Sequence, residues 1–158
     1  MCPMQLEEIV AHCLIHQKKT LAIAESCSGG LLSHRLTNIS GSSSFLMAAL
    51  VTYSYESKTK LLNVPKKLLE KHGAVSRDVA SLMAKNVRKL FKTDFGIGIT
   101  GIAGPTGGTK TKPVGLVFIA LSTKTKVVCL KCHFKGSRLQ VKTQTTTQAL
   151  KLLLRYLS

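Results

Sequence analysis

The spacing of hydrophobic residues changes along the chain and predicts alternating helices and strands. Residues 4–18 carry apolar side chains at helical intervals, whereas residues 20–25 (TLAIAE) form an apolar run of strand length. Residues 31–38 have the composition of a helix, and residues 48–54 form a second strand-length run. The first third of the chain therefore predicts the order helix, strand, helix, strand.

The middle of the chain continues this alternation. Residues 55–62 predict a helix, and Pro65 can occupy the first turn of another short helix that stops near Gly73. Ser76 is the expected N-cap of a longer helix. That helix would place on one face Val79, Leu82, Met83, Val87 and Leu90.

The last part of the chain predicts three strands, a loop and a closing helix. Residues 94–100 (DFGIGIT) form a buried strand, in which Gly96 and Gly98 allow neighbouring elements to approach closely. Residues 101–112 are a loop by composition, and the strands 114–122 and 127–134 can pair across the intervening turn. A helix is expected at 138–157, although its threonines have weak helix propensity.

This order predicts a single domain over residues 1–158. Alternating strands and helices followed by two consecutive strands are typical of a three-layer α/β/α sandwich, with a mostly parallel sheet and an antiparallel edge. Sites in such sheets form at the carboxyl ends of strands. Ser26, Tyr53 and the loop at 101–108 all fall at such ends.

The amino-acid composition limits the kinds of molecule that this protein is expected to bind. Hydrophobic residues make up 44% of the chain and aromatic residues 5%, with no Trp, which disfavours a binding platform of stacked rings. The formal charge of +16 attracts phosphates, nucleotides and nucleic acid. Because the lysines are scattered along the chain, they indicate a solvated surface, and specific binding of nucleic acid is not expected.

Several signals of localisation agree on a cytoplasmic protein. No run of about 18 apolar residues is present, so no membrane span is expected. The first 20 residues hold two Glu and two His, where a signal peptide needs an apolar stretch. The five cysteines, Cys2, Cys13, Cys27, Cys129 and Cys132, are an odd number, which favours reduced thiols over a disulfide framework.

Ser26 lies in a predicted tight turn between a strand and a helix. Its hydroxyl could face a crevice while the amides of Ser28, Gly29 and Gly30 bind an anion or an oxyanion. Such a serine suits acyl transfer. The alternative is that Ser26 and Ser28 are N-caps of the helix that follows.

A nucleophilic serine needs a base. The sequence has no G-x-S-x-G elbow around Ser26 and no evident His and Asp partners. Lys58 could act instead, because a desolvated lysine has a lowered pKa and can accept the serine proton. The alternative is that Lys58 is a solvated surface lysine.

The glycine-rich loop is a candidate phosphate site, because its glycines let several amides converge. Its residues include Gly101, Gly104, Gly107 and Gly108, and Thr100, Thr106, Thr109, Lys110 and Lys112 could add hydroxyls and charge. The alternative is a plain connection between strands.

The segment Cys129-Leu-Lys-Cys132-His133 matches a pattern of haem attachment, and zinc could use the same atoms with His12, Cys13 or His16. Without an export signal or a second cysteine pair, two buried thiols and a half-exposed His133 explain the segment better. No metal or cofactor is therefore expected.

Six motifs in order resemble the CinA C-terminal domain family, also called the nicotinamide-nucleotide amidase family. They are AESCSGG (24–30), GSSSF (41–45), VTYSYESK (51–58), HGAVS (72–76), TGIAGPTGG (100–108) and KPVG (112–115). The resemblance implies a cytosolic hydrolase that converts nicotinamide mononucleotide to nicotinate mononucleotide and ammonia without metal or organic cofactor. It also makes a homo-oligomer the expected assembly.

The resemblance also implies roles for single residues. The family's serine nucleophile falls on Ser26, its tyrosine on Tyr53 and its lysine on Lys58, so Lys58 would deprotonate Ser26 directly or through Tyr53. The family usually has Asn at Tyr55 and Asp at Thr106, so these positions bear on which carboxamide is cut. The alternative function is a nucleotide-binding or interaction module of the same fold that has lost catalysis.

Overall fold

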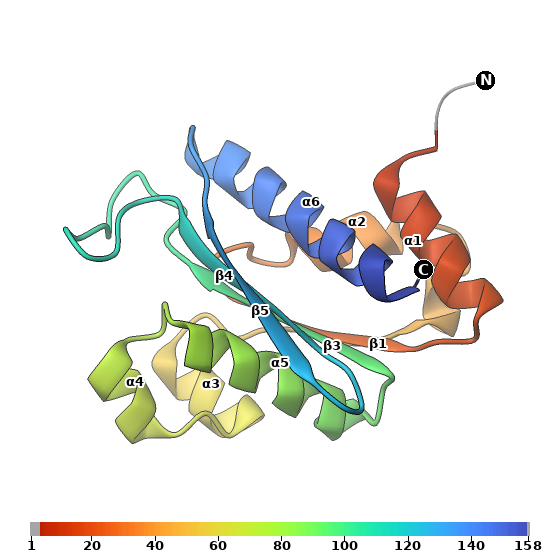
Figure 1. The fold of residues 1–158 in the computed structure, drawn as a ribbon, viewed down its shortest axis with the longest axis horizontal. Coiled ribbons are helices and arrows are strands. Elements are labelled where there is room, and N and C mark those ends of the chain that lie inside the picture. The colour runs from red at the N-terminus through yellow and green to blue at the C-terminus, as the bar shows by residue number, and fades with distance from the viewer. Residues whose placement is uncertain (1–3, 158) are drawn as a thin grey trace.

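A computed structural model describes residues 4–157 as one five-stranded sheet between two layers of helices (Figure 1). The strands are β1 (Leu21–Glu25), β2 (Leu46–Val51), β3 (Phe95–Gly101), β4 (Leu116–Ser122) and β5 (Val127–His133), arranged in the order β2-β1-β3-β4-β5. The strands β2, β1 and β3 are parallel, whereas β4 is antiparallel to both β3 and β5. The expected α/β/α sandwich with a mostly parallel sheet and an antiparallel edge is confirmed.

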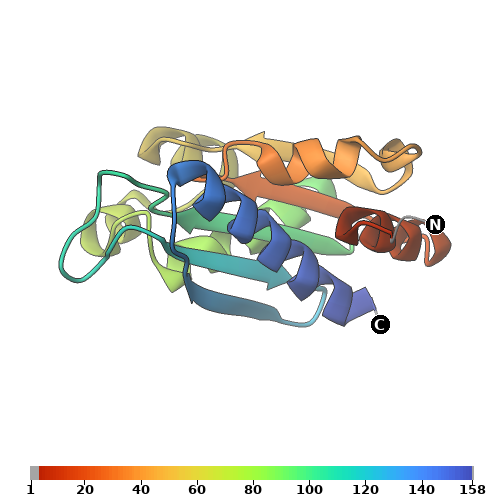
Figure 2. The same ribbon diagram turned by 90° about the horizontal axis from the view of Figure 1, so that it is seen from above.

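The helices cover the two faces of the sheet separately (Figures 1 and 2). One face carries α1 (Leu6–His16), α2 (Leu31–Thr37) and α6 (Arg138–Leu157), while the other carries α3 (Tyr55–Leu62), α4 (Lys66–His72) and α5 (Arg77–Phe91). A short 3-10 helix, η1 (Ser42–Ser44), precedes β2. Each layer has its own apolar core, with Leu14, Leu36 and Leu153 in the first and Leu62, Met83 and Val87 in the second.

The two strand glycines allow α5 to lie almost against β3. A Cβ on Gly96 would be 2.2 Å from the carbonyl oxygen of Ala84, and a Cβ on Gly98 would be 2.3 Å from that of Ala80. The expected close approach at these glycines is confirmed. Leu90, in the last turn of α5, is 55% exposed, so the apolar face of this helix is not buried to its end. Because α5 lies so close to the sheet, its small residues Ala80 and Ala84 are buried against the strands.

Two other boundaries differ from expectation. The strand β2 ends at Val51 rather than Ser54, because Ser54 becomes the N-cap of α3 and accepts a hydrogen bond from the amide of Ser57. Pro65 lies just outside α4, since its backbone is extended (ψ 129°).

The two half-buried cysteines of β5 lie on opposite faces of the sheet. Cys132 packs against the core under α6, and Cys129 packs against the core under α5. A strand alternates its side chains in this way, so the pair cannot converge on one ligand. The expectation of two buried thiols and a half-exposed His133 was wrong in degree, because both thiols are half-buried and His133 is exposed.

The four described cysteines, Cys13, Cys27, Cys129 and Cys132, are free, whereas Cys2 lies outside the described residues. Within residues 4–157, no three His, Cys, Asp or Glu side chains gather closely enough to hold a metal ion. Over the same range, no helix combines the length and the apolar character needed to cross a membrane.

The sheet topology gathers five chain segments at one edge. Because β1, β2 and β3 are parallel, the segments after Glu25, Val51 and Gly101 leave the sheet at the same edge. The strand β5 runs antiparallel to β4 and so ends at this edge too, which brings the start of α6 there. The turn before β4 completes the set, and the candidate site lies among these segments.

Candidate active site

Lys58 and Ser26 form a buried pair at this edge. The Nζ of Lys58 lies 3.0 Å from the Oγ of Ser26, within hydrogen-bond distance. The Lys58 side chain is fully buried, and Ser26 is 8% exposed. The surface-lysine alternative for Lys58 is therefore excluded.

Backbone carbonyls complete the surroundings of the lysine. Its Nζ lies 2.5 Å from the carbonyl oxygen of Thr52 and 3.3 Å from that of Tyr53. A neutral amine has two N–H bonds and one lone pair, which match these two carbonyls and the hydroxyl of Ser26. The arrangement therefore satisfies both an ammonium, which donates to all three oxygens, and a neutral amine, which accepts the serine proton through its lone pair.

Burial also favours the neutral form of the amine. Desolvation lowers the pKa of Lys58 from its usual 10.5 to about 8. The thiol of Cys27 responds in the opposite sense, because burial raises its pKa to about 12. At neutral pH about a tenth of Lys58 is therefore already neutral and able to act as a base beside Ser26, while the neighbouring cysteine stays a thiol.

The local sequence fixes where Lys58 enters. Ser54 and Ser57 form a capping box that starts α3, so Lys58 lies in the first turns of that helix. The amide of Thr52 donates to the carbonyl oxygen of Glu25 (2.9 Å), which joins the ends of β1 and β2. Lys58, which follows β2, is therefore held close to Ser26, which follows β1.

Glu25 organises the turn that carries Ser26. Its fully buried carboxylate accepts hydrogen bonds from the amides of Gly30, Leu32 and Ser33 at 2.9–3.2 Å. An acidic group at the start of a helix also interacts favourably with the helix dipole. Glu25 is therefore the residue that caps α2, a role that the sequence analysis had given to Ser26 or Ser28 as the alternative.

This cap corrects the expected anion site. The amide of Gly30 donates to Glu25, and the amide of Gly29 donates to the carbonyl oxygen of Ser26 (3.0 Å). Neither amide is free to bind an oxyanion. Ser28 is fully buried, and its Oγ has no hydrogen-bond partner among the described residues.

Tyr53 meets a residue that the sequence analysis missed. The guanidinium of Arg138 donates to the hydroxyl of Tyr53 and to the carbonyl oxygen of Gly104, both at 2.8 Å. Lys58 touches Tyr53 only through the backbone carbonyl, and no hydrogen bond within the described residues joins the tyrosine hydroxyl to Lys58 or Ser26. Of the two expected routes, the geometry therefore contains the direct one from Ser26 to Lys58 and no hydrogen-bonded route through the hydroxyl of Tyr53 among the described residues.

A pocket of about 250 Å³ opens beside Ser26. Of the predicted site residues, it is lined by Ser26, Tyr53, Thr100, Gly101, Gly104 and Gly107, and Thr106 also lines it. Lys58 lies behind Ser26. The other predicted binding residues, Ser28, Gly29, Gly30 and Gly108, are not among the residues that line the pocket, and Gly108 is exposed.

Ala74 and Val75 form a wall of this pocket, and three side chains hold the segment 72–75 in place. The hydroxyl of Thr100 donates to the carbonyl oxygen of Ala74 (2.9 Å), and the amide of Ala74 donates to the hydroxyl of Tyr55 (3.2 Å). Lys112 donates to the carbonyl oxygen of His72. Tyr55 therefore supports the wall from outside, and the charge of Lys112 is engaged there.

Two site residues were missing from the sequence analysis. Glu25 belongs to the AESCSGG motif, and a charged residue ending an otherwise apolar strand is a signal that could have identified it. Arg138 gives no comparable signal, because it is one of 23 basic residues and lies 80 positions from Lys58. Only the return of β5 to the common edge places it in the pocket.

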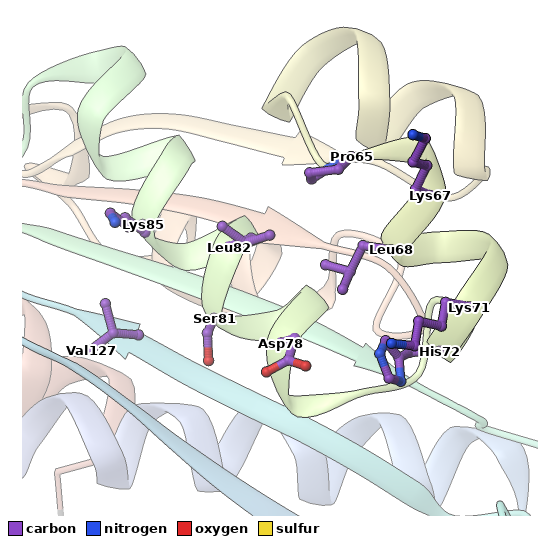
Figure 3. A pocket seen from close by; sticks show the side chains of 10 residues that line it. All are labelled: Pro65, Lys67, Leu68, Lys71, His72, Asp78, Ser81, Leu82, Lys85 and Val127. Carbon is purple, nitrogen blue, oxygen red and sulfur yellow. The ribbon is translucent and has the colours of Figure 1, made fainter.

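A second pocket, of about 760 Å³, lies between α4 and α5, away from the Lys58–Ser26 pair (Figure 3). Its lining includes His72, Asp78 and Ser81, the residue types of a serine hydrolase. No hydrogen bond joins these three within the described residues. We therefore place the chemistry in the smaller pocket, where a nucleophile and a base are in contact.

The fold and this pair define a class of protein, an α/β/α sandwich with a serine–lysine pair at the carboxyl edge of its parallel strands. The family model of the CinA C-terminal domain matches residues 3–157. The chain belongs to the CinA C-terminal domain family. It is 54% identical over 154 residues, 97% of its length, to a CinA-like protein of Syntrophus aciditrophicus.

Solved structures agree with this assignment. The chain is similar to the competence/damage inducible protein CihA from Agrobacterium tumefaciens, with 34% identity and a TM-score of 0.90, covering 98% of this chain and 97% of that one. It is also similar to the competence damage-inducible protein A (ComA) from Klebsiella pneumoniae, with 32% identity and a TM-score of 0.93, covering 96% and 94% of the two chains.

The chain spans only part of its curated relatives. It covers 37% of the length of the CinA-like protein of Syntrophus aciditrophicus. The matched part is the CinA C-terminal domain, and the site described above lies wholly within it.

Proposed function

We propose that this protein is a serine amidohydrolase that converts nicotinamide mononucleotide and water to nicotinate mononucleotide and ammonia. The observation that carries the proposal is the 3.0 Å contact between the Nζ of the buried Lys58 and the Oγ of Ser26. A nucleophile in contact with a base of lowered pKa is the arrangement that acyl transfer requires. The substrate itself is inferred from the resemblance of the motifs.

In the proposed first half-reaction, the Oγ of Ser26 attacks the carboxamide carbon while its proton passes to Lys58. The tetrahedral intermediate collapses as the C–N bond breaks, and the Lys58 proton leaves with the nitrogen as ammonia. An ester between Ser26 and the nicotinoyl group remains. Water then attacks this ester, Lys58 takes a proton from the water, and the proton returns to Ser26 as the carboxylate product departs.

The oxyanion needs donors other than Gly29 and Gly30. The amides of Cys27 and Ser28 lie in the same turn and donate to no carbonyl or carboxylate among the described residues. We assign the oxyanion to these two amides, because preorganised backbone donors stabilise such charge without reorganisation.

The test is ammonia release from nicotinamide mononucleotide by the purified protein and its variants. Ser26→Ala is expected to lower kcat by at least about 10³-fold, as loss of a catalytic serine does. The matched control is Ser81→Ala in the larger pocket, which should retain activity. Full activity in Ser26→Ala would remove this serine from the mechanism, and binding without turnover in the wild type would favour the non-catalytic module.

A further inference from the structure

We propose that Tyr55 is a positioning residue that fixes one wall of the active-site pocket and so limits the size of the ring that the pocket accepts beside Ser26. The inference rests on the proposed function, in which a pyridine ring carries the carboxamide. It adds a residue that does not line the pocket and acts on the substrate through the wall. Tyr55 is also a position at which this chain departs from the family pattern.

The wall belongs to the segment 72–75, which joins α4 to α5 and has a pocket on each side. His72 lines the larger pocket (Figure 3), whereas Ala74 and Val75 line the smaller one. Both Ala74 and Val75 are only half-buried. Packing against the core therefore does not by itself fix the distance between this wall and Ser26.

Two side-chain hydroxyls hold the backbone of Ala74. Its amide donates to the hydroxyl of Tyr55 at 3.2 Å, and its carbonyl oxygen accepts a hydrogen bond from the hydroxyl of Thr100 at 2.9 Å. Thr100 belongs to β3, so this second bond attaches the wall to the sheet. Together the two bonds engage both backbone polar groups of a residue that lines the pocket.

Tyr55 attaches the same wall to the helix that carries the base. It is the first residue of α3, and Lys58 follows three positions later. Side chains at this spacing lie on the same face of a helix. Tyr55 therefore reaches Ala74 while Lys58 reaches Ser26, and one helix sets the distance between the wall and the reacting pair.

Lys112 adds a second tether at the start of the segment. Its ammonium donates to the carbonyl oxygen of His72. The Nζ of Lys112 and the hydroxyl of Tyr55 lie 3.2 and 3.7 Å from the position of a Cβ on Gly73. A glycine with a φ of +71° at this position lets both groups approach the backbone. The two tethers therefore converge on one turn.

The chemical character of the wall indicates which part of the substrate it contacts. The pocket has a volume of about 250 Å³, and its apolar lining includes Ala74, Val75, Ile102 and Ala103. The ring bears the carboxamide that Ser26 attacks, so it must lie in this pocket and pack against such groups. A pocket that closes on an apolar group discriminates against one extra methylene by roughly 10- to 200-fold.

The experiment compares nicotinamide mononucleotide with its analogues methylated at carbon 5 or carbon 6 of the ring. The wild type should discriminate against at least one analogue by about tenfold or more in kcat/KM. Tyr55→Phe removes only the hydroxyl, and the discrimination should fall below about threefold because the wall can then move outward. Tyr156→Phe, near the opposite end of α6 from the pocket, is the matched control and should keep the wild-type ratio.

A second variant removes the other tether. Lys112→Gln should relax the discrimination in the same direction, whereas Lys110→Gln, a change to an exposed lysine of the same loop, should not. If Tyr55 contributes only to stability, Tyr55→Phe will lower kcat/KM for all three compounds by the same factor, which would overturn the proposal. Equal acceptance of all three compounds by the wild type would overturn it too.

A binding measurement separates this inference from the proposed function. Calorimetry on Ser26→Ala should show that adding Tyr55→Phe reduces the difference in affinity between the mononucleotide and its methylated analogues, and that adding Tyr156→Phe does not. This result without hydrolysis by the wild type would refute the proposed function alone. Hydrolysis whose selectivity is indifferent to Tyr55 would refute the inference alone, and absence of binding and hydrolysis would refute both.

Discussion

The Nζ of Lys58 lies 3.0 Å from the Oγ of Ser26, although 32 residues separate them in the chain. Two parallel strands bring these residues together, because β1 ends just before the serine and β2 ends just before the turn that leads to the lysine. The lysine reaches the serine from a fully buried position. Its burial therefore has consequences for both catalysis and stability.

The rate of amide hydrolysis should depend on the protonation of Lys58. Since the pKa of this lysine is lowered to about 8, only about 1% of it is neutral at pH 6. We expect kcat/KM to rise about tenfold per pH unit below 8 and to level off above it. Rates measured between pH 7 and 9.5 avoid titration of the substrate phosphate, whose pKa is about 6.

Lys58→Arg provides the control for this profile. Arginine keeps the positive charge but does not give up its proton in proteins, so the variant should lose activity at every pH. A profile that stays flat from pH 7 to 9.5 in the wild type would exclude Lys58 as the base.

The same lowered pKa should make the stability difference between the wild type and Lys58→Met depend on pH. Between pH 8 and 10.5 the unfolded chain binds more protons at Lys58 than the folded chain does. The contribution of Lys58 to the free energy of unfolding therefore rises with pH across this window, by about 3 kcal/mol in total. Below pH 8 the burial penalty is constant.

Urea denaturation at several pH values would measure this difference. Lys58→Met should be more stable than the wild type at pH 7, with an advantage that shrinks above pH 8, because methionine needs no desolvation of a charge. Subtracting the two curves cancels the titration of the other lysines. A difference independent of pH would mean that the folded lysine has an ordinary pKa.

Glu25 should contribute strongly to stability through its three amide partners. Glu25→Gln keeps the size of the side chain but turns an NH2 group toward N–H donors and removes the charge at the start of α2. We expect a loss of about 2–4 kcal/mol in the free energy of unfolding. Because this turn carries Ser26, activity should fall as well.

Glu56→Gln is the matched control for this loss. Glu56 pairs with Lys60 on the exposed surface of α3 and accepts no buried amide, so its replacement should cost less than about 0.5 kcal/mol. Equal losses in the two variants would show that the hydrogen bonds from the backbone amides to Glu25 contribute little to the free energy of unfolding.

The sequence by itself determined the elements and the class of fold. The closing helix and the helix at 55–62 match their predicted bounds, the strand at 20–25 begins one residue later, and the longer helix capped by Ser76 is confirmed. Local chemistry explains this success, since hydrophobic period, serine caps and glycine stops act within a few residues. The motifs also determined the family, which the comparisons confirm.

The tertiary structure alone decided which groups meet at the site. Whether Lys58 is buried, where the amides of Gly29 and Gly30 point and which arginine enters the pocket all depend on segments brought together by the sheet. Arg138 reaches Tyr53 across 85 residues because β5 ends at the same edge as β1 and β3. Such contacts follow from strand order, and no local pattern in the sequence encodes that order.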